Sequence, residues 1–200
     1  MSVDGAHRAP TLCLASASPR RKALLASIGV AVEVRASNID ETPLENESAH
    51  DYVERLAIAK ARACFGATGL AVLGSDTAVV LDGRVLGKPE SAAHGREMLA
   101  ALSSRTHQVM TGVAVIGPAG TLSTVVTTEV RMRAISDAEI ARYWETGEPW
   151  DKAGGYAIQG LASVFVEEIR GSHSAVVGLP LFETAALLSR QGVSVWSARL

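Results

Sequence analysis

The order in which strand-like and helix-like segments alternate along the chain limits its fold more than any other feature. Residues 11–15 (TLCLA) are an apolar run typical of a buried strand, and a helix is predicted directly after it. Ser18 suits the N-cap of this helix and Pro19 its first turn, and Gly29 ends it. The alternation continues with a strand at 30–35, a helix at 48–68, a strand-rich middle and a closing helix at 181–190. This order is typical of an α/β or α+β fold in which helices pack on a sheet.

The middle of the chain carries the signals of antiparallel hairpins. Asp82-Gly83 lies between two apolar pairs and is a strong two-residue turn signal. A second turn is predicted at residues 117–120 (GPAG), between two β-rich runs at 109–116 and 121–133. We therefore expect at least two long neighbouring strands to run antiparallel.

The remaining segments complete the predicted order. Residues 70–81 are strand-like, with an interruption expected near residues 74–76. Ser136 and Glu139 have the spacing of a capping box, which predicts a helix from there to Gly147. The other predicted elements are a helix at 91–102, a strand at 162–169 and a loop at 171–178.

The size of the chain sets the domain organisation that we expect. It has 200 residues, of which 48% are hydrophobic, and a chain of this length buries enough surface to fold without disulfides or a structural metal. We expect residues 1–10 to be a flexible tail and residues 11–200 to form a single domain.

Charge and hydropathy limit the partners and the location. The 19 Lys and Arg residues and 21 Asp and Glu residues give a net charge of −2, which argues against nucleic acid binding by bulk charge. No apolar run is as long as a membrane-spanning helix, and the polar first ten residues are unlike a signal peptide. We therefore expect a cytoplasmic protein without membrane contact. The five histidines have no metal-ligand spacing and are interpreted as surface or loop residues.

A cluster of hydroxyls and cations lies where the first strand meets the first helix. Ser16, Ser18, Arg20, Arg21 and Lys22 converge there with the unpaired N–H groups of the helix start. Three cations at the positive end of a helix dipole are unfavourable by themselves, so they favour a bound anion such as phosphate. The alternative is a solvated basic first turn.

Lys60 occupies the apolar face of the predicted helix at 48–68. It shares that face with Val53, Leu56 and Cys64. A lysine at such a position usually extends its amine past the edge of the apolar face to water, and the helix pattern favours this interpretation. A cation that faces a cleft is the alternative.

Asp76 places a carboxylate in a strand where a packed sheet normally holds an apolar residue. A buried carboxylate needs a partner, and a metal ion, a role as general base or a salt bridge would each satisfy it. Lys88 follows the next hairpin, and Glu41 would add a second oxygen ligand for Mg²⁺. Glu41 lies in an acidic loop at 39–47 that we expect to be exposed and mobile.

These segments together resemble the Maf family of nucleoside triphosphate pyrophosphatases. Seven of them occur in the family's order between about Leu12 and Leu188, which makes the resemblance highly specific. They are LASASPRRKALL, DETP, ESAHDYVERLAIAKA, GSDTAVVLDGRVLGKP, THQVMTGVAV, DKAGGYAIQG and VVGLPL.

The resemblance implies an α/β fold with a mixed, bent and elongated sheet flanked by helices, and two lobes with a central cleft, related to the inosine triphosphate pyrophosphatases. It also implies hydrolysis of the α–β phosphoanhydride of a nucleoside triphosphate to a monophosphate and pyrophosphate, dependent on Mg²⁺ or Mn²⁺. In the family the residue that matches Asp76 is taken as the base, and those that match Arg20, Glu41, Lys60 and Lys88 line the site.

The charges suit these implied roles. A triphosphate carries about four negative charges, which cations must offset as water attacks the α-phosphorus. Glu41 and Asp76 would hold the metal, and Asp76 would accept a proton from water directly or by way of the metal, which the sequence leaves open. The residues expected to bind substrate are Ser16, Arg20, Arg21, Lys60, Thr77 and Gln159, with Lys88 assigned to catalysis.

Thr77 and the YAIQG segment resemble the family branch that acts on dTTP and UTP, and modified pyrimidine nucleotides are included in this expectation. The amide of Gln159 would donate to O4 and accept from N3–H of uracil or thymine. Two alternatives stay open: the sister branch that acts on 7-methyl-GTP, and a non-catalytic nucleotide-binding regulator of septum formation. The oligomeric state is also open, and a homodimer is one outcome.

Overall fold

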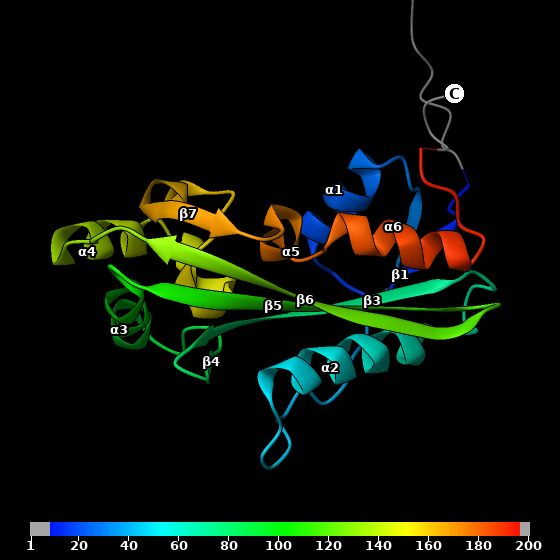
Figure 1. Ribbon diagram of the computed structural model, residues 1–200, viewed down its shortest axis with the longest axis horizontal. Helices are drawn as coiled ribbons and strands as arrows, with labels where there is room; N and C mark the ends of the chain where they lie inside the picture. The colour runs from blue at the N-terminus through cyan, green and yellow to red at the C-terminus, as the bar shows by residue number, and fades with distance from the viewer. Residues whose placement is uncertain (1–8, 197–200) are drawn as a thin grey trace, which may run out of the picture.

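A computed structural model describes residues 9–196 as an elongated mixed sheet with helices on both faces (Figure 1). Residues 1–8, which belong to the predicted tail, and residues 197–200 lie outside this description. The sheet in the described part has seven strands: β1 (Leu12–Leu14), β2 (Val32–Val34), β3 (Val72–Leu81), β4 (Arg84–Leu86), β5 (Thr106–Gly117), β6 (Gly120–Met132) and β7 (Val166–Arg170).

The strand order is β2-β1-β3-β5-β6-β7, and β4 pairs with β3. β1 runs parallel to both β2 and β3, whereas the other neighbours are antiparallel. The parallel part contains the predicted strand–helix alternation, and the antiparallel part contains both predicted hairpins. The mixed α/β sheet expected from the sequence is therefore confirmed.

Helices cover both faces of this sheet. α1 (Pro19–Ser27), α5 (His173–Val177) and α6 (Leu181–Arg190) lie on one face, and α2 (Ala49–Cys64) lies on the other (Figure 1). α3 (Ala92–Leu102) and α4 (Asp137–Glu145) contact each other at the end of the sheet near β4 and β7. The short 3₁₀ helices η1 (Glu148–Asp151), η2 (Ala153–Gly155) and η3 (Leu161–Phe165) follow α4. Among residues 9–196, no helix is both long and apolar enough to span a bilayer.

Two apolar cores lie along the long strands. β3 contributes Leu73 to the core shared with α1 and α6, and Val79 to the core shared with α3 and α4. β5 likewise contributes Val113 to the first core and Val109 to the second. Each core is the interior of one of the two lobes. The long strands β3 and β5 run through both lobes and connect them.

β3 is continuous through residues 74–76, so the predicted interruption there is wrong. Gly74, Ser75 and Asp76 all pair with β5. Gly74 lies so close to α2 that a Cβ atom at this position would come within 2.2 Å of the carbonyl oxygen of Ala57. The glycine is therefore required by the close approach of the helix and does not break the strand.

The predicted helix starts and the first hairpin are confirmed. The hydroxyls of Ser18, Ser91 and Ser136 each accept a hydrogen bond from the N–H three residues later. Asp82 and Gly83 have φ angles of 50° and 76°, as a two-residue turn between twisted strands requires. Each of these signals acts within a few residues of chain.

Two segments after α4 differ from the prediction. The strand predicted at 162–169 begins as the 3₁₀ helix η3 and becomes β7 only at Val166. The loop predicted at 171–178 contains the short helix α5, in which the hydroxyl of Ser172 accepts from the N–H of Ala175. Both helices are too short for their apolar periodicity to be visible in the sequence.

His107 contradicts the interpretation of all histidines as surface or loop residues, whereas His50 and His173 are exposed as predicted. His107 is 2% exposed, and its Nε2 lies 2.7 Å from the hydroxyl of Tyr156. Burial lowers the pKa of His107 from 6.5 to about 4. The position was predictable, since His107 shares the inward alternation of β5 with Val109.

This burial predicts a loss of stability in acid. Between pH 6.5 and 4 the unfolded chain binds a proton at His107 that the folded protein does not, so the free energy of unfolding falls as the pH is lowered. The shift corresponds to about 3 kcal/mol. Urea denaturation at pH 6.5 and at pH 4 measures this change. The free energy of unfolding should fall less between these two values in His107→Gln than in wild type.

The exposed His173 provides the matched control for this prediction. The His173→Gln variant should lose as much stability between pH 6.5 and 4 as wild type, because its side chain is not buried in the folded protein. Equal losses in wild type and in His107→Gln would contradict the burial argument.

Candidate active site

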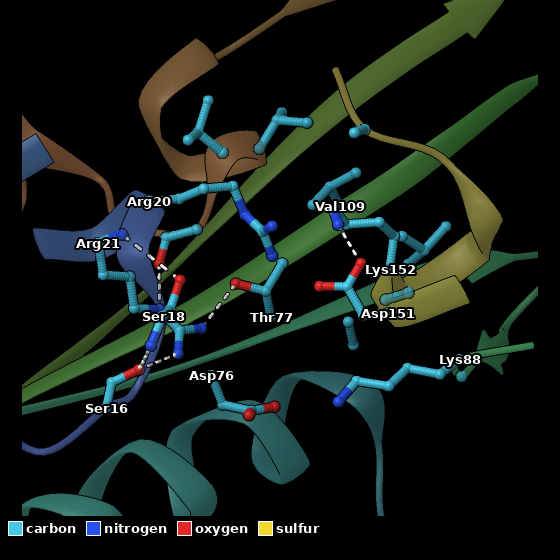
Figure 2. A pocket seen from close by; sticks show the side chains of 18 of the residues that line it. Ser16, Ser18, Arg20, Arg21, Asp76, Thr77, Lys88, Val109, Asp151 and Lys152 are labelled. Carbon is cyan, nitrogen blue, oxygen red and sulfur yellow. Dashed lines mark hydrogen bonds and ion pairs between the residues drawn. The ribbon is translucent and has the colours of Figure 1, made fainter. Parts of the chain in front are cut away.

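A cleft of about 700 Å³ lies between the two cores, and all nine predicted site residues line it, whereas Lys22 of the same cationic cluster does not. Side chains from the start of α1, from β3 and from the segment after α4 face into it (Figure 2). The predicted residues on its wall are Ser16, Arg20, Arg21, Glu41, Lys60, Asp76, Thr77, Lys88 and Gln159. The fold therefore brings together positions that are far apart in the chain.

β3 supplies functional groups to both sides of the cleft because successive residues of a strand point to opposite faces. Asp76 points toward α2, where it meets Lys60, and Thr77 points toward α1, where it meets Arg21. Ser75, on the same face as Thr77, donates a hydrogen bond of 3.0 Å to the carbonyl oxygen of Gly178. β3 thus places the carboxylate of Asp76 beside α2 and the hydroxyls of Ser75 and Thr77 on the face that α1 covers.

Arg21 is held in place by three hydrogen bonds. Its Nε donates to the carbonyl oxygen of Gly178 at 2.9 Å, its Nη1 to Ser16 Oγ at 3.1 Å, and its Nη2 to Thr77 Oγ1 at 3.4 Å. Burial lowers the pKa of the Arg21 guanidinium from 12.5, and the negative charge of Asp76 opposes this effect. Arg21 therefore sets a fixed positive charge in the cleft wall.

Arg20 and Lys88 differ from Arg21, because neither side chain makes a hydrogen bond or an ion pair within residues 9–196. Both extend into the cleft from opposite walls (Figure 2). Arg20 lies in the first turn of α1, where unpaired backbone N–H groups also favour an anion. Two positive charges are thus free to meet a ligand.

Lys60 faces the cleft, so the favoured interpretation of a lysine that reaches past the helix edge to water is wrong. The residue is 8% exposed, and its Nζ lies 2.6 Å from Asp76 Oδ1 and 2.8 Å from Glu41 Oε1. The two carboxylates compensate the cost of burying the ammonium group, which an apolar helix face alone would not. The sequence signal was correct in position but did not identify the partners.

Asp76 forms a salt bridge with Lys60. This is one of the three ways in which, from the sequence, we expected the buried carboxylate to be satisfied. Burial raises the pKa of the Asp76 carboxyl above 3.8, while the positive charges of Lys60 and Arg21 oppose the increase. The net effect makes Asp76 a stronger base than an exposed aspartate, which suits proton transfer.

The acidic loop that carries Glu41 is tied to α2. The hydroxyl of Tyr52 donates to the carbonyl oxygen of Glu41 at 2.9 Å, and Arg55 forms an ion pair with Glu47 and donates to the carbonyl oxygen of Thr42. The loop is exposed as predicted, and the Glu41 side chain is half-exposed at the cleft. These contacts keep one carboxylate next to Lys60.

Asp151 and Lys152 line the cleft but were not predicted. Their side chains form an ion pair on the wall that faces Arg20 (Figure 2). The hydrogen bond from Lys152 lowers the pKa of Asp151, and the charge of Arg20 adds to this effect. The N–H of Gly154 donates to the carbonyl oxygen of Gly87 at 3.0 Å, which places this segment beside Lys88. The sequence did contain a sign that these two residues belong to the site, because they are a charged pair directly before a glycine-rich stretch.

Gln159 lies in a tight turn at the rim of the cleft. The N–H of Gly160 donates to the carbonyl oxygen of Ala157 at 3.0 Å, and Gln159 is exposed within this turn. Its side-chain amide makes no hydrogen bond within residues 9–196, whereas the hydroxyl of Thr77 is already engaged by Arg21 and Thr111. Thr77 and Gln159 both belong to the segments that resemble the dTTP and UTP branch, and of these two residues Gln159 is the one with free polar atoms.

The cleft concentrates positive charge in a chain whose net charge is −2. Its wall holds five cationic side chains against three carboxylates. They are Arg20, Arg21, Lys60, Lys88 and Lys152 against Glu41, Asp76 and Asp151. Such a surplus is suited to a ligand with several negative charges, such as a polyphosphate.

The chain resembles known proteins along nearly its whole length. The family model described as "Maf-like protein" matches residues 11–191. A dTTP/UTP pyrophosphatase of Hahella chejuensis is 47% identical over 198 residues, which is 97% of this chain and 98% of that protein. A dTTP/UTP pyrophosphatase of Anaeromyxobacter dehalogenans is 55% identical over 188 residues, 92% of this chain and 95% of that protein. A HAM1 protein from Coxiella burnetii has a TM-score of 0.50 at 18% identity, over 90% of this chain and 99% of that one, and shares the fold.

Proposed function

The chain belongs to the Maf family, and on that premise we propose that it hydrolyses the α–β phosphoanhydride of dTTP and UTP to the nucleoside monophosphate and pyrophosphate. The observation that carries the proposal is a surplus of cations around one buried carboxylate, Asp76, in the same cleft. Cations suit a triphosphate, and a buried carboxylate suits removal of a proton from the attacking water. Modified pyrimidine nucleotides with the same base edge fit the same site.

The free cations bind the triphosphate. Arg20 and Lys88 reach it from opposite walls, and Lys152 adds a third charge once a phosphate competes with Asp151. Arg21 is already positioned by Ser16, so it contributes its field without rearrangement.

Asp76 acts as the general base. Lys60 holds its Oδ1, which leaves Oδ2 to accept the proton of the water that attacks the α-phosphorus. As the bond to the β-phosphate breaks, negative charge grows on the departing pyrophosphate, and Lys88 and Arg20 stabilise it. The hydrogen bond from Lys60 keeps the base oriented.

Asp76 and Glu41 fit a divalent cation such as Mg²⁺ or Mn²⁺. One oxygen of each carboxylate contacts Lys60 Nζ, at 2.6 Å for Asp76 and 2.8 Å for Glu41, so the two carboxylates are close neighbours. Residues 9–196 contain no group of three or more His, Cys, Asp and Glu side chains that would hold a metal by themselves. Mg²⁺ commonly takes only one or two carboxylates together with phosphate and water oxygens, which this pair allows. A bound ion would supply positive charge to the phosphate oxygens.

The metal assignment predicts the behaviour of Glu41→Gln. The amide keeps the size of the side chain but loses its charge, so the Mg²⁺ concentration for half-maximal activity should rise about tenfold. Pyrophosphate release from UTP during a Mg²⁺ titration, after removal of metal with EDTA, measures this value. Glu45→Gln, an exposed position in the same loop, should leave it unchanged. Full activity in EDTA would contradict the assignment.

The proposed function is tested by pyrophosphate release from UTP, dTTP, CTP and 7-methyl-GTP. We expect the highest kcat/KM for UTP and dTTP. A preference for 7-methyl-GTP would instead support the sister activity. Tight nucleotide binding without any pyrophosphate release would support a non-catalytic regulator and reject the enzyme.

A further inference from the structure

The turn that carries Gln159 is held at both ends by two residues outside the cleft wall. At its start, the N–H of Ala157 donates to the hydroxyl of Tyr143 at 3.2 Å. After its end, the N–H of Leu161 donates to Glu148 Oε2 at 3.0 Å, and the N–H of Ala162 to Glu148 Oε1 at 3.3 Å. The hydroxyl of Tyr143 in turn donates to Glu148 Oε1 at 2.8 Å. We call Tyr143 and Glu148 the clamp.

Burial, ring packing and close backbone approach all restrict where the two side chains of the clamp can lie. Tyr143 is 4% exposed, and its ring packs edge-on against Phe165 with the centroids 5.5 Å apart. Burial, and then the hydrogen bond to Glu148, raise the pKa of Tyr143, so its hydroxyl stays protonated and donates. A Cβ atom at Gly160 would come within 2.1 Å of Glu148 Oε2, so the glycine admits the carboxylate beneath the turn.

Gln159 itself has no such support. Its side chain is exposed and makes no hydrogen bond within the described residues, so the backbone of the turn alone sets where its amide lies. A hydrogen-bonding reader of a base edge must be placed within a few tenths of an ångström, because hydrogen bonds weaken steeply with distance and angle. Whatever fixes the turn therefore fixes the selectivity.

We propose that Tyr143 and Glu148 are positioning residues that set base selectivity by holding the Gln159 turn at both ends. This inference rests on the proposed pyrimidine nucleotide pyrophosphatase activity. Tyr143 and Glu148 make no hydrogen bond or ion pair with any of the predicted phosphate or metal residues. Its loss should therefore weaken recognition of the base and leave the reaction at the α-phosphorus intact.

The test compares kcat and KM for UTP and CTP in wild type, Tyr143→Phe and Glu148→Gln. In both variants the ratio of kcat/KM for UTP to that for CTP should fall about tenfold, as expected when a polar contact is misplaced. The change should appear mainly in KM for UTP, with kcat largely retained. Two conservative variants at different positions keep the test valid if one of them fails to fold.

Glu139→Gln is the matched control, because Glu139 caps the same helix α4 without touching the turn. It should destabilise α4 and leave the UTP/CTP ratio unchanged. A drop in the ratio equal to that of the clamp variants would show that general loosening of α4 is the cause and would overturn the proposal.

A second background separates positioning from a structural role. In the Gln159→Ala protein, which lacks the reader, the clamp substitutions should cause no further change in the UTP/CTP ratio. If the clamp substitutions lowered the UTP/CTP ratio by the same factor in the Gln159→Ala protein as in wild type, the two effects would be independent and the proposal would be overturned. If Gln159→Ala abolished the preference for UTP over CTP but both clamp variants kept it, the role of the clamp would be overturned and the role of Gln159 would stand. Absence of pyrophosphate release by wild type would overturn the proposed function and this inference with it.

Discussion

Asp76→Asn should hydrolyse UTP with a kcat about 10² to 10⁴ times lower than wild type, the range expected for loss of a general base. The amide keeps the shape of the carboxylate but cannot act as a base, and its neutral oxygen is a weaker ligand for a divalent cation than a charged carboxylate. Lys60, which lies 2.6 Å from Asp76 Oδ1, still has Glu41 as a partner, so the local structure should persist. Rapid-mixing or steady-state measurement of pyrophosphate release at saturating UTP gives the effect on kcat.

The stability of this variant is part of the same expectation. Because burial raises the pKa of Asp76, the charged carboxylate is disfavoured in the folded protein, and a neutral amide should not lower the melting temperature by more than a few degrees. Asp82→Asn is the matched control, since Asp82 lies on the same hairpin but is exposed and paired with Arg105. It should keep wild-type kcat. A folded Asp76→Asn protein with near-normal kcat would remove Asp76 from the mechanism.

The features that the sequence predicts well are those that act over a few residues. Ser18 and Ser136 cap helices because a hydroxyl reaches an N–H three positions later, and that geometry needs no tertiary context. Asp82-Gly83 forms its turn for the same reason. The candidate site was also predictable as a set, because the family resemblance fixes which positions share a cleft, and all of them line it.

The features that the sequence does not reveal depend on contacts between distant segments. Gly74 looks like a strand break until α2 is packed on it, and Lys60 looks like a lysine that reaches water until Asp76, 16 residues away, lies beside it. The clamp follows the same logic, because Glu148 reaches backbone groups 13 and 14 residues further on. In each case the residue satisfies a partner that only the fold brings near.

Gln159→Glu is expected to change which pyrimidine the protein prefers. The amide of Gln159 can donate to O4 of uracil and accept from N3–H, whereas a carboxylate at this position can only accept. Its second oxygen would face O4, so UTP and dTTP should lose on the order of 10² to 10⁴ in kcat/KM. CTP should lose less, because its N4 amino group can donate to the carboxylate, although its N3 stays unsatisfied.

The ratio of kcat/KM values, and not the rate with one substrate, decides this prediction. A new negative charge at the cleft rim repels every triphosphate, and that effect lowers UTP and CTP hydrolysis alike. Only contact with the base edge makes the two losses differ, so the UTP/CTP ratio should fall in Gln159→Glu relative to wild type. Gln159→Ala, which removes the donor and the acceptor without adding charge, should lower UTP hydrolysis without the same penalty to CTP. An unchanged ratio in Gln159→Glu would show that Gln159 does not read the base, and selectivity would then have to come from the apolar wall of the cleft.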